Sequence, residues 1–417
     1  MTFRIRPLLM AAALATALTT SLIAPQAQAE NVRIAFIDPL SGPFAPVGQT
    51  LVKSFQLVAE TANRDKWSPG NTFEIVPFDN KASPQESLTV LKAAIDQGIR
   101  YIVQGNGSGA AGALIDAINK HNDRNPGKEI VFLNYAAVDP DLTNSKCSFW
   151  HFRFDANSDM KMEALRTYLA KDKAIKKVYI IGQNYAHGHQ VTRAAKEYLK
   201  RKRPDIEIVG DDLHPIGSVK DFSPYVAKIS ASGADVVITG NWGSDLSLLI
   251  KAARESGLKS RFYTYYAYTN GVPTAMGASG ADYVKYIGTW SVNEESKAGK
   301  DLVDGFKKKF NDDYYAITTY SAIQVLAAGI NQAKTSDPVK VAFAMEGLKM
   351  KSVNGDIEMR KTDHQLQQPL YINTWAKVNR KDVKYDQENT GYGWKIEQKI
   401  DSYVAAQPTS CSMKRPS

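Results

Sequence analysis

Hydrophobic positions follow two patterns that alternate along most of this chain. Short runs of β-branched and aromatic residues, such as 32–37 and 178–182, predict buried strands. Longer segments between such runs, for example 50–63, carry apolar residues at helical spacing and predict amphipathic helices. Strands that alternate with helices are typical of parallel sheets flanked by helices, so the pattern predicts an α/β fold.

Two series of such units follow each other, and the second begins near Phe154. The first is expected to contain strands at 32–37, 73–79, 101–103 and 130–133 and helices at 50–63 and 84–97. The second is expected to contain strands at 178–182, 206–212, 235–240 and 261–266 and helices at 160–170, within 184–201, at 222–231 and at 246–256. A strand at 286–290 and helices at 297–310, 318–333 and 339–346 follow, and then runs at 357–360, 370–378 and 393–398 that alternate like antiparallel strands. Two series of βα units predict two α/β domains.

The loops after the predicted strands carry most of the residues suited to binding. In parallel sheets, ligands bind beyond the carboxyl ends of the strands, which lead into loops 38–49, 104–112, 134–140, 183–189, 241–245 and 264–273. Five of these six loops are rich in Gly, Ser, Asn or aromatic residues. Loop 104–112 also places small residues in the first turn of a helix, where free N–H groups attract an anion. The sequence therefore predicts a ligand-binding cleft.

Residues 1–29 have the pattern of a signal peptide. Arg4 and Arg6 precede an apolar run at 8–23, and Ala27-Gln28-Ala29 is a small-x-small cleavage motif. Cleavage after Ala29 is expected, and no other apolar stretch approaches the length of a membrane span. We therefore expect the mature chain to be exported.

The charge pattern argues against nucleic acid as a partner, and the two cysteines predict a disulfide. The chain has 417 residues with 52 basic and 43 acidic side chains, a formal net charge of +9. Its basic clusters, such as 200–203, have the pattern of exposed helix ends, and no RNA- or DNA-binding motif accompanies them. Cys147 and Cys411 are the two cysteines of the sequence, and in an oxidising compartment they are expected to form a disulfide.

One motif suggests a dinucleotide site. Gly105-x-Gly107-x-x-Ala110 fits the G-x-G-x-x-G/A fingerprint between a strand and a helix. It follows the third strand of the series, however, and the acidic Glu129 precedes the next strand instead of ending it. An exported enzyme that holds a phosphate-bearing ligand at this loop is therefore kept only as the less favoured alternative.

Catalytic and metal-binding patterns are weak. No G-x-S-x-G surrounds Ser108, so the nucleophile-elbow context is missing. His187 and His189 lie two residues apart, without a Cys or carboxylate at ligand spacing. The sequence thus predicts recognition groups, with no catalytic residue, no metal and no cofactor.

Six motifs in order resemble the periplasmic branched-chain amino acid binding proteins, which are type I solute receptors of ABC importers. They are VRIAFIDPLSGPFAPVGQ, QGNGSGAAGA, NYAAVDPDLT, QNYAHGH and GNWGSDLSLLIKAARESGL, preceded by the signal peptide, and the resemblance spans about 32–378. It implies two lobes, each a parallel sheet flanked by helices, joined by three crossing segments near 152, 270 and 355, with a hinge that closes on the ligand. The implied division is signal peptide 1–29, lobe one 30–152 plus 271–354, lobe two 153–270 plus 355–395, and tail 396–417. A monomer in the periplasm that delivers a small molecule to a membrane permease is the expected function, or a sensor subunit of the same fold.

The resemblance also implies a ligand site. The family's hydroxyl-bearing positions correspond here to Ala110 or Ala111 and to Val138, which leaves backbone groups to hold a carboxylate or carbonyl. Asp245 matches the family's acidic group for the ligand ammonium, and Tyr185 matches its second-lobe tyrosine. The expected ligand-binding residues are Phe44, Ser108, Gly109, Ala110, Ala111, Ala136, Val138, Tyr185, Trp242 and Asp245.

The missing hydroxyls change the expected ligand. A hydrogen bond to a charged group contributes about 1.5–3 kcal/mol, so two missing bonds would weaken an ordinary leucine-type site by about 3–6 kcal/mol. We therefore expect a small amino acid or a related apolar carboxylate or amide, with an aromatic acid as the alternative.

Overall fold

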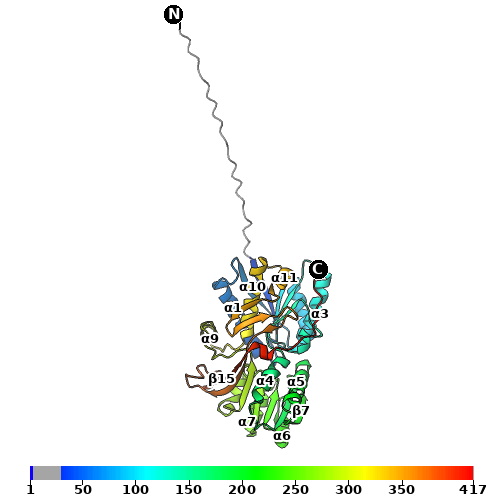
Figure 1. The fold of residues 1–417 in the computed structure, drawn as a ribbon, viewed down its shortest axis with the longest axis vertical. Coiled ribbons are helices and arrows are strands. Elements are labelled where there is room, and N and C mark those ends of the chain that lie inside the picture. The colour runs from blue at the N-terminus through cyan, green and yellow to red at the C-terminus, as the bar shows by residue number, and fades with distance from the viewer. Residues whose placement is uncertain (3–29, 417) are drawn as a thin grey trace.

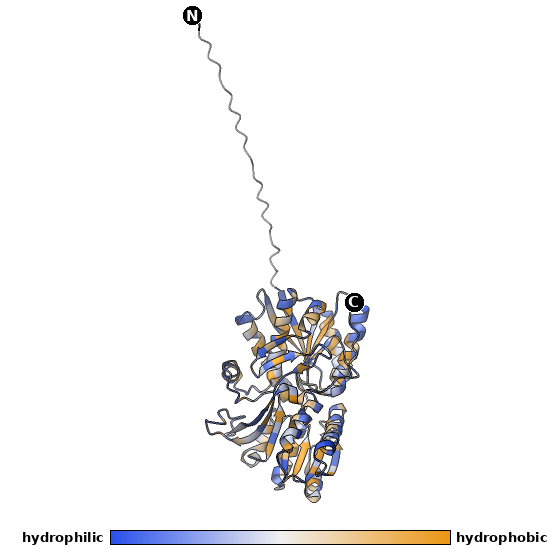
Figure 2. Ribbon diagram, in the orientation of Figure 1, coloured by the Kyte–Doolittle hydropathy of each residue, from blue (hydrophilic) through white to orange (hydrophobic). Residues whose placement is uncertain are grey.

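The computed structural model describes residues 1–2 and 30–416, so the expected signal peptide lies almost wholly outside the described residues. Two sheets, each with its own hydrophobic core, divide the rest of the chain into an upper and a lower lobe (Figure 1). Apolar residues concentrate on the strands inside each lobe, and polar residues cover the outer faces of the helices (Figure 2). Among the described residues, no helix is both long and apolar enough to cross a membrane.

The first lobe contains a five-stranded parallel sheet in the order β2-β1-β3-β4-β5. Its strands are β1 (Glu30–Asp38), β2 (Asn71–Asp79), β3 (Tyr101–Gln104), β4 (Val131–Asn134) and β5 (His151–Arg153). The helices between them are α1 (Ala45–Arg64), α2 (Pro84–Asp96) and α3 (Ser108–Arg124), and a 3-10 turn, η1, spans Pro140–Thr143. Ser83 caps α2, because its Oγ accepts a hydrogen bond of 3.2 Å from the Glu86 N–H.

The second lobe contains a seven-stranded sheet in the order β15-β14-β10-β9-β8-β6-β7. Its parallel strands are β6 (Lys177–Gln183), β7 (Glu207–His214), β8 (Val236–Thr239), β9 (Arg261–Thr264) and β10 (Val284–Gly288), and the antiparallel ones are β14 (Leu370–Lys377) and β15 (Tyr392–Ile400). Its helices are α4 (Ser158–Leu169), α5 (Ala186–Lys202), α6 (Ser223–Ser232), α7 (Gly243–Glu255) and α8 (Val272–Met276), with the 3-10 turn η2 (Ala278–Gly280).

The chain returns to the first lobe between these last strands. α9 (Lys297–Phe310), α10 (Ile317–Ala333) and α11 (Pro338–Met345) contribute to the first core, and so does a small sheet of β11 (Lys349–Ser352), β12 (Gly355–Met359) and β13 (Leu366–Gln367). The alternation of strands and helices, the α/β class and the two-lobed architecture predicted from the sequence are confirmed.

The crossings between lobes differ in position from two of the expected boundaries. β10 pairs with β9 and β14, so the chain leaves the second sheet after Gly288 and not near 270. Ile357 and Met359 of β12 belong to the first core, so the last crossing follows Leu366 and not residue 354. β15 extends to Ile400, past the expected start of the tail at 396. We therefore propose lobes of 30–154 plus 290–367 and 156–288 plus 370–400.

Hydrogen bonds join the three crossings into one hinge. Arg153 Nε donates to Gln365 Oε1 at 2.6 Å, and Gln365 Nε2 donates to the Asp155 carbonyl at 2.9 Å. Asn354 Nδ2 donates both to the Thr289 carbonyl and to Gln368 Oε1, each at 2.9 Å. Any opening of the lobes must turn about this bonded set.

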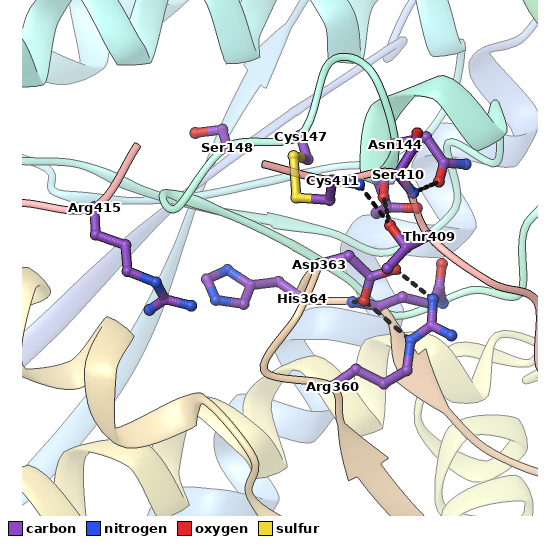
Figure 3. The surroundings of a disulfide bond; sticks show 12 residues. Asn144, Cys147, Ser148, Arg360, Asp363, His364, Thr409, Ser410, Cys411 and Arg415 are labelled. Carbon is purple, nitrogen blue, oxygen red and sulfur yellow. Dashed lines mark hydrogen bonds and ion pairs between the residues drawn. A yellow bond between two sulfur atoms is a disulfide. The ribbon is translucent and has the colours of Figure 1, made fainter. Parts of the chain in front are cut away.

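A fourth connection runs through the C-terminal tail. α12 (Ser402–Ala405) packs on α4 of the second lobe, and Tyr198 of that lobe donates to Gln407 Oε1 at 2.6 Å. The next residues lie on the first lobe, where the Ser410 N–H donates to Asn144 Oδ1 at 3.1 Å. Figure 3 shows the disulfide between Cys147 and Cys411, which fixes this end of the tail and confirms the predicted pairing.

Removing this disulfide is expected to destabilise the protein. A double Cys147→Ser, Cys411→Ser variant loses a cross-link between residues 264 apart in sequence, which restricts the unfolded chain. We expect a fall of about 2–4 kcal/mol in the free energy of unfolding, measured by urea denaturation. Reduced wild-type protein should show the same fall, and equal stability of oxidised wild type and double variant would contradict the expectation.

Candidate ligand-binding site

A cavity lies where the two lobes meet. The empty space at this position, including its opening to solvent, is about 530 Å³. Its walls come from α1, from the loops after β3 and β4, from the first crossing, from the loops after β6, β8 and β9, and from the start of α10 and the loop before it. The lining residues are Val47, Leu51, Gly105, Asn106, Gly107, Ser108, Tyr135, Ala136, Ala137, Val138, Asp155, Tyr185, His187, Trp242, Tyr266, Tyr268, Thr269, Tyr315, Ala316 and Thr318.

The N-terminus of α3 forms one wall of the cavity. Gly107 precedes the helix with a φ of 97°, a conformation that favours glycine. Behind it, a Cβ on Gly105 would lie 2.7 Å from the Tyr135 ring, so only glycine allows this close packing. The N–H groups of residues 108–110 have no acceptor among the described residues. They carry the positive end of the helix dipole and are suited to bind a carboxylate.

A buried carboxyl group holds the loop that leads into α3. Asp38 accepts hydrogen bonds from the N–H of Gly105 at 3.2 Å, from the N–H of Asn106 at 2.9 Å and from the Tyr135 hydroxyl. Burial raises the pKa of Asp38 from 3.8 to about 7, although these hydrogen bonds act in the opposite direction. Asp38 therefore shapes the cavity wall from behind.

This raised pKa makes stability depend on pH. The folded protein holds the Asp38 proton more tightly than the unfolded chain does, so the stabilisation is fully present below about pH 4 and is lost as the pH rises through 7. Relative to wild type, an Asp38→Asn variant should therefore gain stability between pH 5 and pH 8. Urea denaturation of both proteins at each pH isolates this group from the histidines, and a pH-independent difference would contradict the assignment.

An aromatic cluster closes the cavity on the side of the second lobe. Trp242 Nε1 donates to the Tyr185 hydroxyl at 2.9 Å. Phe44, from the first lobe, packs on Trp242 with ring centroids 4.1 Å apart and belongs to the core of the second lobe. A Cβ on Gly243 would lie 2.7 Å from the Phe44 ring, so this contact also depends on a glycine. The lobes are therefore in direct contact around the cavity.

One charged side chain lines the cavity, and a second charge compensates it. Asp155 Oδ2 accepts from Lys161 Nζ at 2.8 Å, and the Lys161 side chain is fully buried. Burial raises the pKa of Asp155 and lowers that of Lys161, while their attraction opposes both shifts. Burial also lowers the pKa of His187 to about 3, so this cavity residue is neutral at pH 7.

Half of the residues predicted for the site line the cavity. Ser108, Ala136, Val138, Tyr185 and Trp242 do so. Phe44 lies behind Trp242, Gly109 faces Pro84, and Ala110 and Ala111 are buried on α3. The role of each in binding stays a prediction.

Asp245 does not lie where an ammonium group could reach it from the cavity. It is buried, and its Oδ2 accepts from Gln183 Nε2 and from the Gly217 N–H, both at 2.8 Å. It thus ties the loop after β7 to α7, at whose first turn it lies.

An Asp245→Asn variant should therefore show whether Asp245 contributes to stability or to ligand binding. We expect ligand affinity to stay within about threefold of wild type, while the free energy of unfolding falls by about 1–3 kcal/mol because two hydrogen bonds to a charged oxygen become bonds to a neutral amide oxygen. Calorimetric titration and urea denaturation measure the two effects. A loss of affinity without a loss of stability would restore Asp245 to the site.

Several cavity residues escaped the sequence prediction. Tyr266 and Tyr268 lie in an alternating tyrosine run, and the sequence does not say which of its residues face a ligand. Tyr315 lies in the loop before α10 and Thr318 in the first turn of that helix, and no local motif marks either residue. Asp155 lies in the first crossing between the lobes. No sequence motif there shows that its carboxylate faces a cavity.

Comparisons with known proteins agree with this architecture. Residues 31–381 match a family model described as periplasmic binding protein. The chain is 33% identical over 411 residues to the Leu/Ile/Val-binding protein homolog 4 of Brucella abortus (strain 2308), covering 94% of each chain. The closed structure of a leucine-, isoleucine-, valine-, threonine- and alanine-binding protein from Brucella ovis superimposes with a TM-score of 0.80 at 30% identity, covering 92% of this chain and 99% of that one.

A more distant structure shows the fold alone. The solute-binding protein of an ABC transporter from R. palustris, in complex with benzoate, has a TM-score of 0.77 at 18% identity and covers 91% of this chain and 99% of its own. The family model matches most of the described chain, and the Brucella abortus relative matches over nearly its full length. The chain therefore belongs to the family of periplasmic binding proteins that includes the Leu/Ile/Val-binding proteins.

Proposed function

We propose that the protein is the solute-binding component of an ABC importer, exported to the periplasm after cleavage behind Ala29. It captures a small molecule with a carboxylate group in the cavity between its lobes and presents the closed complex to a membrane permease. Family members are binding proteins and not enzymes, and we extend this to the present chain.

The observation that carries the proposal is the make-up of the cavity. Both lobes contribute to it, so a ligand inside it contacts both and stabilises their closure. The unpaired N–H groups of residues 108–110 offer donors to a carboxylate, and aromatic side chains cover the remaining walls. Such a site supports selective capture.

A thermal-unfolding screen tests the proposal. A ligand that binds only the folded protein stabilises it by about 2.7 kcal/mol at a hundred times its dissociation constant. We expect at least one compound among amino acids, amides and aromatic acids to raise the unfolding temperature of the mature protein. An Ala136→Trp variant, whose indole would occupy the cavity, should not respond, and an equal response of both proteins would place the ligand elsewhere.

Transport and sensing are distinguished by the membrane partner. If the proposal holds, a strain that lacks the protein should lose uptake of the radiolabelled ligand, and Ala136→Trp should not restore it. Normal uptake without the protein would favour the sensor alternative.

A further inference from the structure

The inference that follows rests on the proposed function and concerns the class of ligand. We infer that the cavity selects carboxylates without an ammonium group, and that Lys161 excludes the ammonium by neutralising Asp155. The preferred ligand is a planar or aromatic acid that carries a second oxygen acceptor.

The first observation is the charge of the cavity wall. Asp155 is the one carboxylate that lines the cavity in the described chain, and its Oδ2 lies 2.8 Å from Lys161 Nζ. Its Oδ1 accepts from the Ala156 N–H at 2.8 Å. Lys161 is 0% exposed and lies 4.5 Å from the centroid of the Tyr266 ring, so it is held in place by packing as well as by charge. The lysine charge therefore balances the aspartate charge at the cavity wall.

The second observation concerns the other acidic candidate. Asp245 has its Oδ2 bonded to Gln183 and to the Gly217 backbone, and it does not line the cavity. Its Oδ1 has no hydrogen-bond partner among the described residues, but it lies outside the cavity lining. A ligand ammonium in the cavity would therefore contact no carboxylate other than Asp155, whose charge Lys161 balances. Losing hydration without a counter-charge is costly for a cation, so an α-amino acid is disfavoured.

The third observation is the surplus of hydrogen-bond donors. Tyr315 lines the cavity, and its buried hydroxyl has no hydrogen-bond partner among the residues that the structure describes. The Tyr185 oxygen accepts from Trp242, which leaves its own proton free to be donated. With the N–H groups of 108–110, these donors suit a ligand that presents oxygen acceptors. The rings of Tyr185, Trp242, Tyr266, Tyr268 and Tyr315 supply flat apolar walls for its body.

Matched pairs of ligands test the inference. Leucine and phenylalanine carry an ammonium group at the α-carbon. Their partners, 4-methyl-2-oxopentanoate and phenylpyruvate, carry an oxo group there instead. Calorimetric titration of the mature protein at pH 7.5 should give at least about tenfold tighter binding of the oxo acid in each pair. Equal or tighter binding of the amino acids would overturn the inference and leave the proposed function intact. If none of the four binds and no compound in the thermal screen does, the proposed function fails and the inference fails with it.

Two variants test the role assigned to Lys161. In Lys161→Met, Asp155 loses the cation that is bonded to it, so the ratio of affinities should shift by at least about tenfold toward the amino acid of each pair. In the double variant Asp155→Asn, Lys161→Met, no charge remains, and the oxo acid should stay preferred. An unchanged ratio in Lys161→Met, or a reversed preference in the double variant, would overturn the assignment. If the single variant does not fold, the double variant and the ligand pairs still decide.

Discussion

Replacing Trp242 by alanine is expected to weaken ligand binding by about 30- to 100-fold. Trp242 lines the cavity, packs on Phe44 of the opposite lobe and donates to the Tyr185 hydroxyl. Large aromatic residues that fill enclosed contacts contribute about 2 kcal/mol or more to binding. The truncation removes a wall of the site and a contact between the closed lobes, and each loss weakens the complex with the ligand.

Calorimetric titration with the ligand found in the thermal screen measures this loss. Trp67 provides the control, because it packs on Tyr320 with ring centroids 4.9 Å apart and does not line the cavity. A Trp67→Phe variant should bind within about twofold of wild type. Similar affinities of the Trp242→Ala and Trp67→Phe proteins would contradict the assignment of Trp242 to the site.

Replacing Arg153 by methionine is expected to lower the free energy of unfolding by about 3–5 kcal/mol. The guanidinium is fully buried at the first crossing and donates to the Asp139 carbonyl at 2.5 Å, to Gln365 Oε1 at 2.6 Å and to Thr143 Oγ1. Burial lowers its pKa to about 10, so it stays charged at pH 7 and compensates nearby carboxylates. Methionine fills similar space and leaves these acceptors unpaired.

Urea denaturation in the absence of ligand measures the loss. Arg64→Met is the matched control, since the Arg64 side chain is 69% exposed and pairs with Asp65, whose side chain is 46% exposed. It should change stability by less than about 0.5 kcal/mol. An Arg153→Met protein as stable as this control would show that the bonds at the hinge contribute little.

Local elements were predictable because their causes are local. The small residues at the start of α3 and the helical spacing of 297–310 act within a few positions of the sequence, and the structure has these features where expected. The position of the cleft was also predictable, because strands of one parallel sheet end at the same edge.

Features that depend on distant partners were not predictable. β10 joins the second sheet because it lies beside β9 and β14, which no motif near 284–288 indicates. The direction of the Asp245 side chain is set by Gln183 and Gly217, and the neutralisation of Asp155 by a lysine one helical turn into α4. The resemblance to the family indicated Asp245, but the packing places Asp155 at the cavity and Asp245 outside its lining.

The structure of a complex tests the central claim most directly. Crystals of the mature protein grown with the tightest-binding carboxylate should show it between the lobes, with its carboxylate oxygens within hydrogen-bond distance of the N–H groups of residues 108–110. Its body should lie between Tyr185, Trp242 and Tyr268, with no ammonium at Asp155. A ligand bound outside this cavity, or one whose carboxylate lies away from the start of α3, would contradict the account.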